Sequence, residues 1–366
     1  MGVDMMRTYR FIGALLILLC PAIFGETHIW TSREGKTAVA EFQALEGGTL
    51  VLKKGSKTIR VPLDGFTDGD QTYARKCAEE LKAKVRRLEE EERLERIGSL
   101  KGLRRSVPVT ARHWEDWKDY YTESTCGRDM LDFFKNERSI VDVRNKGVFI
   151  SVEDAVRPPG YAPTMAVYCP SDYDGKEKMG IYIHVSPGNN ATVPNQGYRE
   201  MMDKYRLVCA SPNGSGNDQS DMRRCALALD TLAQLREDYA IDEDRIYIGG
   251  TSGGGAEATF ATFLYPQDFR AALNSVRYFL LTSNACLPFA DRSHIREASK
   301  HQQPFAFISG PDDSNYNYMP DSEQSFKDHG FVVKFFDIPG MGHETASAET
   351  FDKVMQWVED NNPRLK

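Results

Sequence analysis

The sequence has no excess of positive charge, since its 366 residues include 46 Lys and Arg against 53 Asp and Glu, a formal net charge of −7. A protein that binds nucleic acid generally presents a basic surface to the phosphates, so this balance argues against a nucleic-acid partner. The hydrophobic share of 41% and the charged share of 27% are typical of a globular protein. The length is sufficient for one large domain and a smaller one, and the sequence contains no internal repeat.

The sequence has seven cysteines, and their spacing excludes the common zinc and redox motifs. The cysteines form no Cys-x-x-Cys pair and no zinc-ligand pattern, so the sequence predicts no metal site. An exported protein can form disulfides, but these spacings do not define a pairing. Cys209 lies in the apolar run 207–210, which favours a buried free thiol.

The apolar run near the N-terminus is too short to span a bilayer. It covers residues 11–19 and follows Arg7 and Arg10. A basic segment followed by a short apolar one is typical of a secretory signal peptide, here residues 1–25. We therefore expect an exported protein, either periplasmic or extracellular. An uncleaved membrane anchor and lipid attachment at Cys20 are the alternatives, although the large residue before this cysteine disfavours the second.

Residues 26–75 predict a small antiparallel β unit. Short runs of β-branched and aromatic residues alternate with turns that contain glycine. The predicted strands cover residues 28–32, 38–42, 50–52 and 58–61.

This unit resembles the Sla1 homology domain 1 family. The resemblance rests on short segments spread over the unit: Trp30-Thr31, Gly35-Lys36, Ala40-Glu41-Phe42, Val51-Leu52-Lys53, and Val61-Pro62-Leu63 followed by Asp70-Gln71. It implies a small SH3-like β-barrel that binds a peptide or protein partner and takes no part in chemistry.

Residues 76–110 predict a charged helix and a linker. Lys, Arg and Glu dominate residues 73–97, and a thin apolar stripe repeats at intervals of about four residues, as in an amphipathic helix. The stripe fails at Glu91 and Glu92, which favours a solvated linker helix over the alternative of a coiled-coil partner site. Residues 98–110 are then expected to be an irregular linker.

From residue 111 to residue 366, predicted strands alternate with predicted helices. This alternation is typical of an α/β fold, in which helices cover both faces of a mostly parallel sheet. The strands are expected at 148–152, 165–168, 180–185, 207–210, 245–248, 271–273, 304–309 and 331–336, and two well-defined helices at 222–239 and 351–359.

The end of the strand at 245–248 predicts a nucleophile. It runs into Gly250-Thr251-Ser252-Gly253-Gly254, and an alanine-rich helical segment follows. A strand, a sharp turn around Gly-x-Ser-x-Gly and a helix form a nucleophile elbow, in which Ser252 is the nucleophile. A phosphate-binding glycine loop is the alternative, but this segment lacks the Lys of a P-loop and the spacing of a Rossmann motif.

An acid and a base follow in the order that such an elbow requires. The strand at 304–309 ends in Gly310-Pro311-Asp312-Asp313, and either aspartate can serve as the acid. The base is predicted at His343, which lies between the last strand and the last helix and is preceded by flexible glycines. The other histidines in the C-terminal part of the sequence border polar helical segments and are poorer candidates for the base: His294, His301 and His329.

An oxyanion hole needs two hydrogen-bond donors beside the nucleophile. The first is the N–H of Gly253, and the second is expected from the loop that follows the strand at 180–185. Pro187 has no N–H, so the second donor is Ser186 or Val185. The usual His-Gly pattern of this loop is absent, because Val185 stands in place of the glycine.

Residues 165–360 resemble the α/β-hydrolase fold, and within it the esterase and polyhydroxybutyrate-depolymerase-like branch. The resemblance rests on the segment 244–255 around Ser252, on Ser309-Gly310-x-x-Asp313-x-Asn315, and on the segment 338–344 around His343. The spacing of the acid in these relatives selects Asp313, with Asp312 as the alternative.

The resemblance implies an exported serine hydrolase that cleaves carboxylic esters through an acyl-enzyme, with Ser252, His343 and Asp313 as the triad and no metal or cofactor. Export favours acylated polysaccharide or polyester as substrates. Asn315, Tyr316 and Tyr318 are expected either to line the substrate pocket or to lie in a surface loop. The alternatives are a serine peptidase of the same fold, and a catalytically silent binding protein in which the small barrel is the working part.

Overall fold

The computed structural model describes residues 27–113, 140–142, 148–150, 157, 160–219, 221–281 and 292–366. The chain divides into two compact units, with the boundary between Arg96 and Ile97. The predicted signal peptide lies outside the described residues. Among the helices that are described, none combines the length and the apolarity that crossing a membrane requires.

The N-terminal unit contains a four-stranded antiparallel sheet, and the predicted strands are confirmed. The strands follow one another in the sheet in sequence order: β1 (Thr27–Thr31), β2 (Thr37–Glu46), β3 (Thr49–Lys54) and β4 (Lys57–Pro62). Trp30 is buried in its core with Leu50 and Leu52, and the Trp30 indole N–H donates to the Ala40 carbonyl at 3.1 Å. An SH3-like barrel remains a prediction, because the sheet order is open from β1 to β4.

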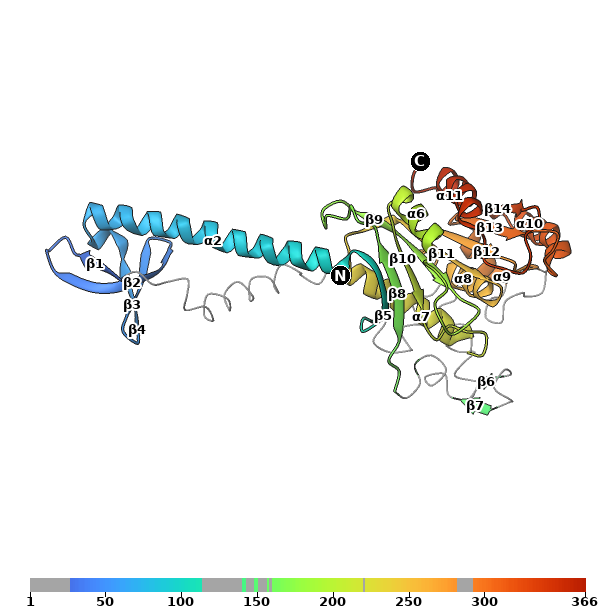
Figure 1. The fold of residues 1–366 in the computed structure, drawn as a ribbon, viewed down its shortest axis with the longest axis horizontal. Coiled ribbons are helices and arrows are strands. Elements are labelled where there is room, and N and C mark those ends of the chain that lie inside the picture. The colour runs from blue at the N-terminus through green and yellow to red at the C-terminus, as the bar shows by residue number, and fades with distance from the viewer. Residues whose placement is uncertain are drawn as a thin grey trace. The chain divides into compact units, whose positions relative to one another are not determined.

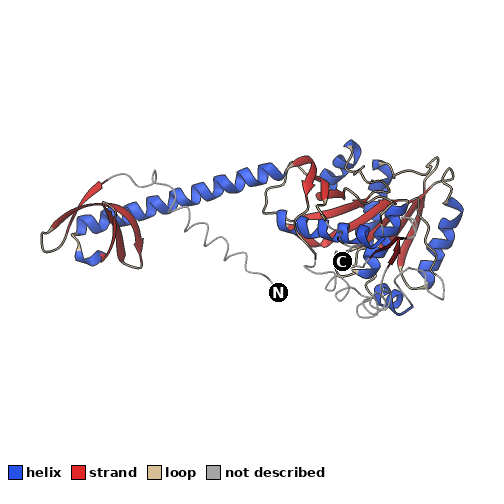
Figure 2. Cartoon of the chain, turned by 90° about the horizontal axis from the view of Figure 1, so that it is seen from below, coloured by secondary structure: helices blue, strands red, loops and turns tan. Residues whose placement is uncertain are grey.

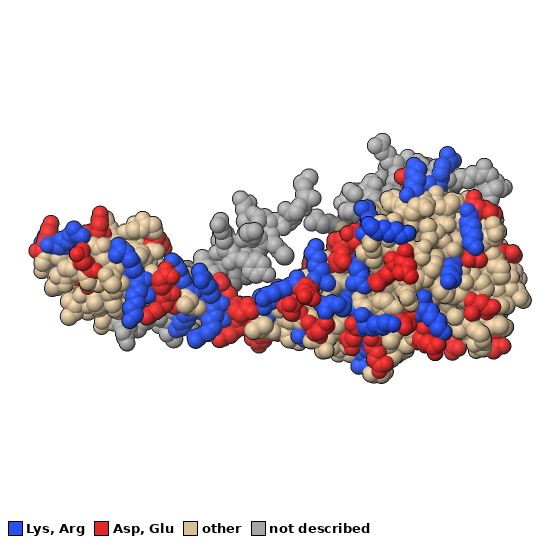
Figure 3. Space-filling view, turned by 90° about the horizontal axis from the view of Figure 1, so that it is seen from above, with Lys and Arg blue, Asp and Glu red and all other residues tan. Residues whose placement is uncertain are grey.

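The helix α2 (Asp68–Leu100) confirms the predicted charged helix and extends it at both ends. Its start is fixed to β1 because the Asp70 carboxylate accepts a hydrogen bond from the Thr31 N–H at 2.8 Å and contacts His28 Nε2 at 2.6 Å. Positive and negative side chains alternate along its exposed surface, as Figure 3 shows. Near its end, Ile97 and Leu100 are buried in the core of the C-terminal unit.

The C-terminal unit is built on an eight-stranded sheet with the order β14-β13-β12-β11-β9-β10-β8-β5 (Figure 1). The strands from β14 to β10 are parallel, whereas β8 runs antiparallel to both of its neighbours. Their bounds are β5 (Gly102–Pro108), β8 (Thr164–Cys169), β9 (Met179–Val185), β10 (Leu207–Pro212), β11 (Ile241–Thr251), β12 (Ala271–Ser275), β13 (Pro304–Ser309) and β14 (Val332–Asp337). A separate hairpin joins β6 (Ile140–Asp142) and β7 (Val148–Ile150).

The linker predicted at residues 98–110 is wrong, because β5 is the edge strand of this sheet. The pairing of β5 with β8 shifts register between Arg104 and Val107, and Ser106 between them has a left-handed backbone with φ of 55°. Such a bulge breaks the alternation of inward and outward side chains by which a strand is recognised in a sequence.

Helices cover both faces of the sheet (Figure 2), as the strand and helix alternation predicts. The helices α7 (Asp221–Asp238), α8 (Gly253–Leu264), α9 (Arg292–Ser299) and α10 (Met319–Asp328) share one core, and α6 (Gln196–Tyr205) and α11 (Ala348–Asn361) share the other. The alternation along β9 separates the cores, since Ile181 and Ile183 point to the first and Tyr182 to the second. Cys209 is a fully buried free thiol in the second core, as predicted. The unit has an α/β-hydrolase-like fold.

Candidate active site

Ser252 lies in the sharp turn between β11 and α8, with φ of 54° and ψ of −119°. A serine seldom adopts a positive φ, so the surrounding structure must hold it there. The Ser252 N–H donates to the carbonyl of Ser275 at 2.8 Å, which ties the turn to the end of the neighbouring strand β12. The turn presents the half-buried Ser252 side chain at the carboxyl edge of the sheet.

Two glycines around Ser252 are required because backbone meets backbone there. A Cβ on Gly250 would lie 2.2 Å from the Gly254 carbonyl carbon, and a Cβ on Gly254 would lie 1.9 Å from the Val185 carbonyl oxygen. Both separations are far below van der Waals contact, and neither partner is a side chain that could rotate away. The spacing of the Gly-x-Ser-x-Gly motif therefore has a direct steric cause.

The structure brings Ser252, His343 and Asp313 together in one hydrogen-bonded chain. His343 Nε2 lies 2.9 Å from Ser252 Oγ, and His343 Nδ1 lies 2.7 Å from Asp313 Oδ1. With a proton on Nδ1, the imidazole donates to the carboxylate and accepts from the serine hydroxyl. In this arrangement the imidazole can take the proton of Ser252.

Asp313, not Asp312, is the aspartate that contacts His343. Asp313 is 5% exposed, and its carboxylate also accepts hydrogen bonds from the Ser309 hydroxyl at 2.6 Å and the Asn315 N–H at 3.2 Å. These bonds fix the orientation of the carboxylate toward the imidazole. Asp312 is exposed, and its side chain makes no hydrogen bond with the described part of the chain.

The loops that carry the acid and the base touch through their backbones. A Cβ on Gly310 would lie 2.1 Å from the Ile338 carbonyl oxygen and 2.7 Å from that of Met341. Glycine at 310 therefore allows the acid loop to approach the segment that leads to His343. This contact sets the distance across which Asp313 and His343 meet.

The residues predicted for the oxyanion hole border the elbow. Gly253 is the first residue of α8, and the segment Val185–Ser186 lies against the adjacent Gly254. Ser186 is fully buried, and its hydroxyl accepts a hydrogen bond from the Gly188 N–H at 3.2 Å. Ser186 stays the predicted second donor, with Val185 as the alternative.

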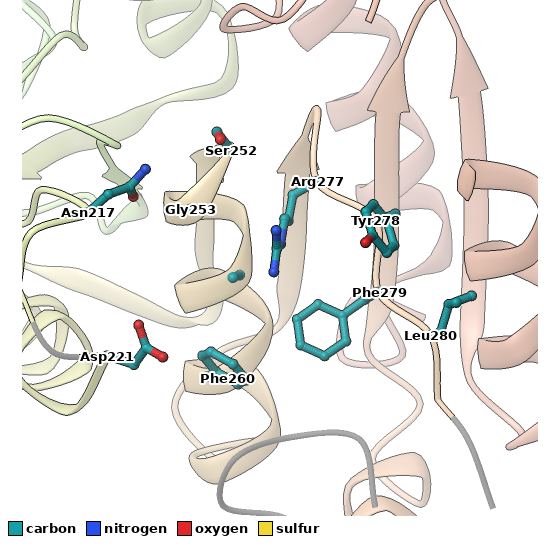
Figure 4. Close-up of a pocket in the computed structure, with 10 residues that line it drawn as sticks. Asn217, Asp221, Ser252, Gly253, Phe260, Arg277, Tyr278, Phe279 and Leu280 are labelled. Carbon is teal, nitrogen blue, oxygen red and sulfur yellow. The ribbon is translucent and has the colours of Figure 1, made fainter. Parts of the chain in front are cut away.

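A pocket of about 530 Å³ opens beside Ser252, a volume typical of small-molecule sites. In Figure 4, Ser252 and Gly253 lie at its upper end, Phe260 and Phe279 at its lower end, and Arg277 between them. The described residues that line it are Asn217, Asp221, Ser252, Gly253, Ala256, Phe260, Arg277, Tyr278, Phe279 and Leu280. Asn315, Tyr316 and Tyr318 are not among them, although Tyr318 stacks on Tyr278 with ring centroids 4.7 Å apart.

Sequence reasoning missed the charged and amide residues of this pocket, among them Asn217 and Arg277. Asn217 follows β10, and a Cβ on Gly253 would lie 2.0 Å from the Asn217 side-chain oxygen, so this amide packs directly on the elbow. Arg277 follows β12. The signal that could have found them is their place after the carboxyl ends of parallel strands, where ligands bind in open α/β sheets.

A buried polar network lies beneath the elbow. His184 is 1% exposed, and its Nδ1 lies 3.2 Å from the Tyr182 hydroxyl and its Nε2 3.5 Å from Thr251 Oγ1. The Thr251 hydroxyl in turn lies 2.7 Å from that of Thr345. Because Thr251 directly precedes Ser252 and Thr345 lies two residues after His343, this network connects the segment of Ser252 to that of His343.

The network predicts a pH-dependent stability. Desolvation lowers the pKa of His184 to about 4, from an ordinary value of 6.5. Between these pH values the unfolded chain binds more protons at this site than the folded protein does. The contribution of His184 to the free energy of unfolding is therefore fully present above pH 6.5 and decreases as the pH falls toward 4. The shift corresponds to about 3 kcal/mol. Urea unfolding at several pH values should show a shallower pH dependence for His184→Asn than for the wild type; equal slopes would contradict the assignment.

In the described part of the chain, no group of three or more His, Cys, Asp and Glu side chains is placed to hold a metal ion.

No family model matches this chain. Acyl-protein thioesterase 1 of Neurospora crassa is 31% identical over 136 residues, which are 37% of this chain and 53% of that protein. The chain thus spans about half the length of this curated relative.

Solved structures with a distant likeness include a ferulic acid esterase, which is 14% identical with a TM-score of 0.44 and coverage of 56% of this chain and 93% of that one. An esterase of Thermogutta terrifontis is also 14% identical, with a TM-score of 0.41 and coverage of 54% and 88%.

Proposed function

We propose that this protein is a serine hydrolase that cleaves carboxylic esters through an acyl-enzyme. The observation that carries the proposal is the continuous hydrogen-bonded chain from Ser252 through His343 to Asp313, which opens on a pocket large enough for an acyl or aryl group. The similarity to an acyl-protein thioesterase supports hydrolysis of an acyl group, and thioesters therefore belong among the substrates to be examined.

The proposed mechanism has two steps, acylation and deacylation, and each passes through a tetrahedral intermediate. His343 removes the hydroxyl proton of Ser252 while Oγ attacks the carbonyl carbon, and the imidazolium then protonates the departing alcohol. Water, deprotonated by the same imidazole, attacks the acyl-enzyme; the bond to Ser252 Oγ breaks, the carboxylic acid is released, and the imidazolium returns its proton to Ser252. Asp313 holds the imidazole in the required tautomer, and the N–H groups of Gly253 and Ser186 stabilise the oxyanion.

The setting of the enzyme is part of the proposal. The signal peptide predicted at residues 1–25 supports a location in the periplasm or outside the cell, where acylated polysaccharide and polyester are the expected substrates. In this proposal the N-terminal unit binds a peptide or protein partner.

A fluorophosphonate probe tests the proposal directly. An activated serine attacks the phosphorus of the probe, so we expect stoichiometric labelling on the tryptic peptide that contains Ser252. Tandem mass spectrometry identifies the modified residue, and heat-denatured protein is the control. Absence of labelling on folded protein, or labelling confined to another serine, would overturn the proposal.

A substrate panel then separates the ester hydrolase from the peptidase alternative. Acetylated, feruloylated and polyester substrates, a thioester and a set of peptide amides are compared at equal concentration. We expect turnover of at least one ester and none of the amides. Turnover of peptide amides alone would leave Ser252 as the nucleophile but assign the chain to peptide cleavage.

A further inference from the structure

Arg277 enters the pocket from a strained segment at the end of β12. The preceding residue, Val276, has a φ of 52°, which is rare for a β-branched residue. Two hydrogen bonds hold it there: the Val276 N–H donates to the Ile308 carbonyl at 2.8 Å, and the Asn315 amide donates to the Val276 carbonyl at 2.9 Å. Backbone strain of this kind is concentrated at functional sites, and here it directs the next side chain into the pocket.

The guanidinium of Arg277 has no carboxylate partner among the described residues. Its Nε is buried and makes no hydrogen bond, and its contact with the Tyr278 ring is distant, at 5.6 Å from the ring centre. The acidic residue of the same pocket, Asp221, lies 3.9 Å from Arg224 instead. Arg224 is fully buried and also pairs with Glu257 at 3.1 Å, so two carboxylates share this one guanidinium. Arg277 is thus a cation of the pocket whose guanidinium has no carboxylate partner in the described part of the chain.

Aromatic rings surround this charge. Phe260 of α8 and Phe279 meet edge to face with centroids 5.5 Å apart at the lower end of the pocket (Figure 4). Tyr278 is held by stacking on Tyr318. Apolar walls exclude water from a bound ligand and strengthen the attraction of a guanidinium for a negative group. A neutral apolar ester would bury against these rings but leave Arg277 without a partner.

We propose that Arg277 selects esters that carry a carboxylate on the group occupying this pocket. Arginine binds carboxylate oxygens through two parallel N–H donors, which fixes both position and orientation. The guanidinium without a carboxylate partner and the aromatic walls together fit a substrate with an apolar body and a carboxylate. The proposal rests on the proposed ester hydrolysis at Ser252 and adds the substrate class, with Arg277 as a specificity-determining residue.

Matched ester pairs test this selection. On the acyl side, 4-nitrophenyl butyrate is compared with mono-4-nitrophenyl succinate, in which a carboxylate replaces the terminal methyl group. On the alcohol side, phenyl butyrate is compared with 4-carboxyphenyl butyrate. Spontaneous hydrolysis is subtracted with the Ser252→Ala protein. We expect the charged member of one pair to have a kcat/KM at least about tenfold higher, a preference that decreases as salt screens the charge.

The variants assign the preference to Arg277. Arg277→Met should raise KM for the preferred charged ester by about 10- to 100-fold, while the neutral ester stays within about twofold. Arg277→Lys keeps the charge but loses the paired N–H donors, so its KM for the charged ester should lie between those of the wild type and Arg277→Met. Arg364→Met, an exposed arginine beyond α11, is the matched control and should leave both esters unchanged.

Two failures are distinguishable in this design. If the wild type hydrolyses the neutral esters and prefers neither charged ester, or if Arg277→Met lowers activity on both members of a pair equally, the role of Arg277 is overturned and the proposed hydrolase stands. If the wild type hydrolyses no ester, the proposed function itself fails. The wild-type comparison decides even where a variant does not fold.

Discussion

Ser252→Ala is expected to lower kcat for 4-nitrophenyl butyrate by about 10⁶-fold, because the variant has no atom that can form the acyl-enzyme. The substitution removes only a hydroxyl, and the Ser252 N–H that ties the turn to Ser275 is retained. The domain should therefore fold as before, which circular dichroism and thermal unfolding can verify. Steady-state kinetics with a sensitive ester measures the residual rate.

A matched control distinguishes this loss from a general effect of serine substitution. Ser314 lies in the acid loop and is exposed, so Ser314→Ala should keep the wild-type kcat. Wild-type turnover by Ser252→Ala would exclude Ser252 as the nucleophile, whatever its contact with His343.

Asp313→Asn should lower kcat by about 10⁴-fold with little change in KM. The carboxylate accepts a hydrogen bond from the N–H at His343 Nδ1, whereas an amide nitrogen at the same place favours the tautomer in which Nε2 carries the proton and cannot act as a base. Because Asp313 also accepts from the Ser309 hydroxyl and the Asn315 N–H, some loss of stability is expected as well. Burst and steady-state kinetics on a nitrophenyl ester measure the effect.

The neighbouring aspartate is the control for this prediction. Asp312→Asn removes the same charge one residue away, from a side chain that does not contact the imidazole, and should change kcat by less than about threefold. Equal losses in the two variants would indicate an electrostatic role of the loop as a whole and would contradict the assignment of Asp313.

The elbow could be predicted from the sequence because its requirements are local. A strand, two glycines and a serine lie within a dozen residues, and the steric reason for Gly250 acts within that stretch, whereas Gly254 is required by the distant Val185. The order of acid and base along the chain follows from the topology of the sheet, so His343 could also be predicted from the sequence. The sequence could distinguish Asp313 from Asp312 only through the spacing of the acid in the family it resembles. The difference in burial between the two aspartates is a property of the folded loop.

The pocket could not be predicted because its residues come from segments far apart in the sequence. Asn217 follows β10, Phe260 belongs to α8, and Arg277 follows β12, and no short motif joins them. Likewise β5 has a bulge at Ser106 that hides its pattern. Non-local assembly and backbone irregularity are properties that composition and periodicity do not record.

The glycine contacts at the elbow separate the reaction from the choice of substrate. Main-chain atoms form the contacts among Gly250, Gly254 and Val185. The orientation of Ser252 therefore does not depend on the aromatic and charged side chains that form the pocket walls. The pocket walls formed by Phe260, Arg277 and Phe279 can accordingly be substituted while the position of Ser252 in its turn is retained. For an engineer this makes the chain a scaffold in which new acyl or alcohol preferences can be installed from the wall residues, with the elbow left untouched.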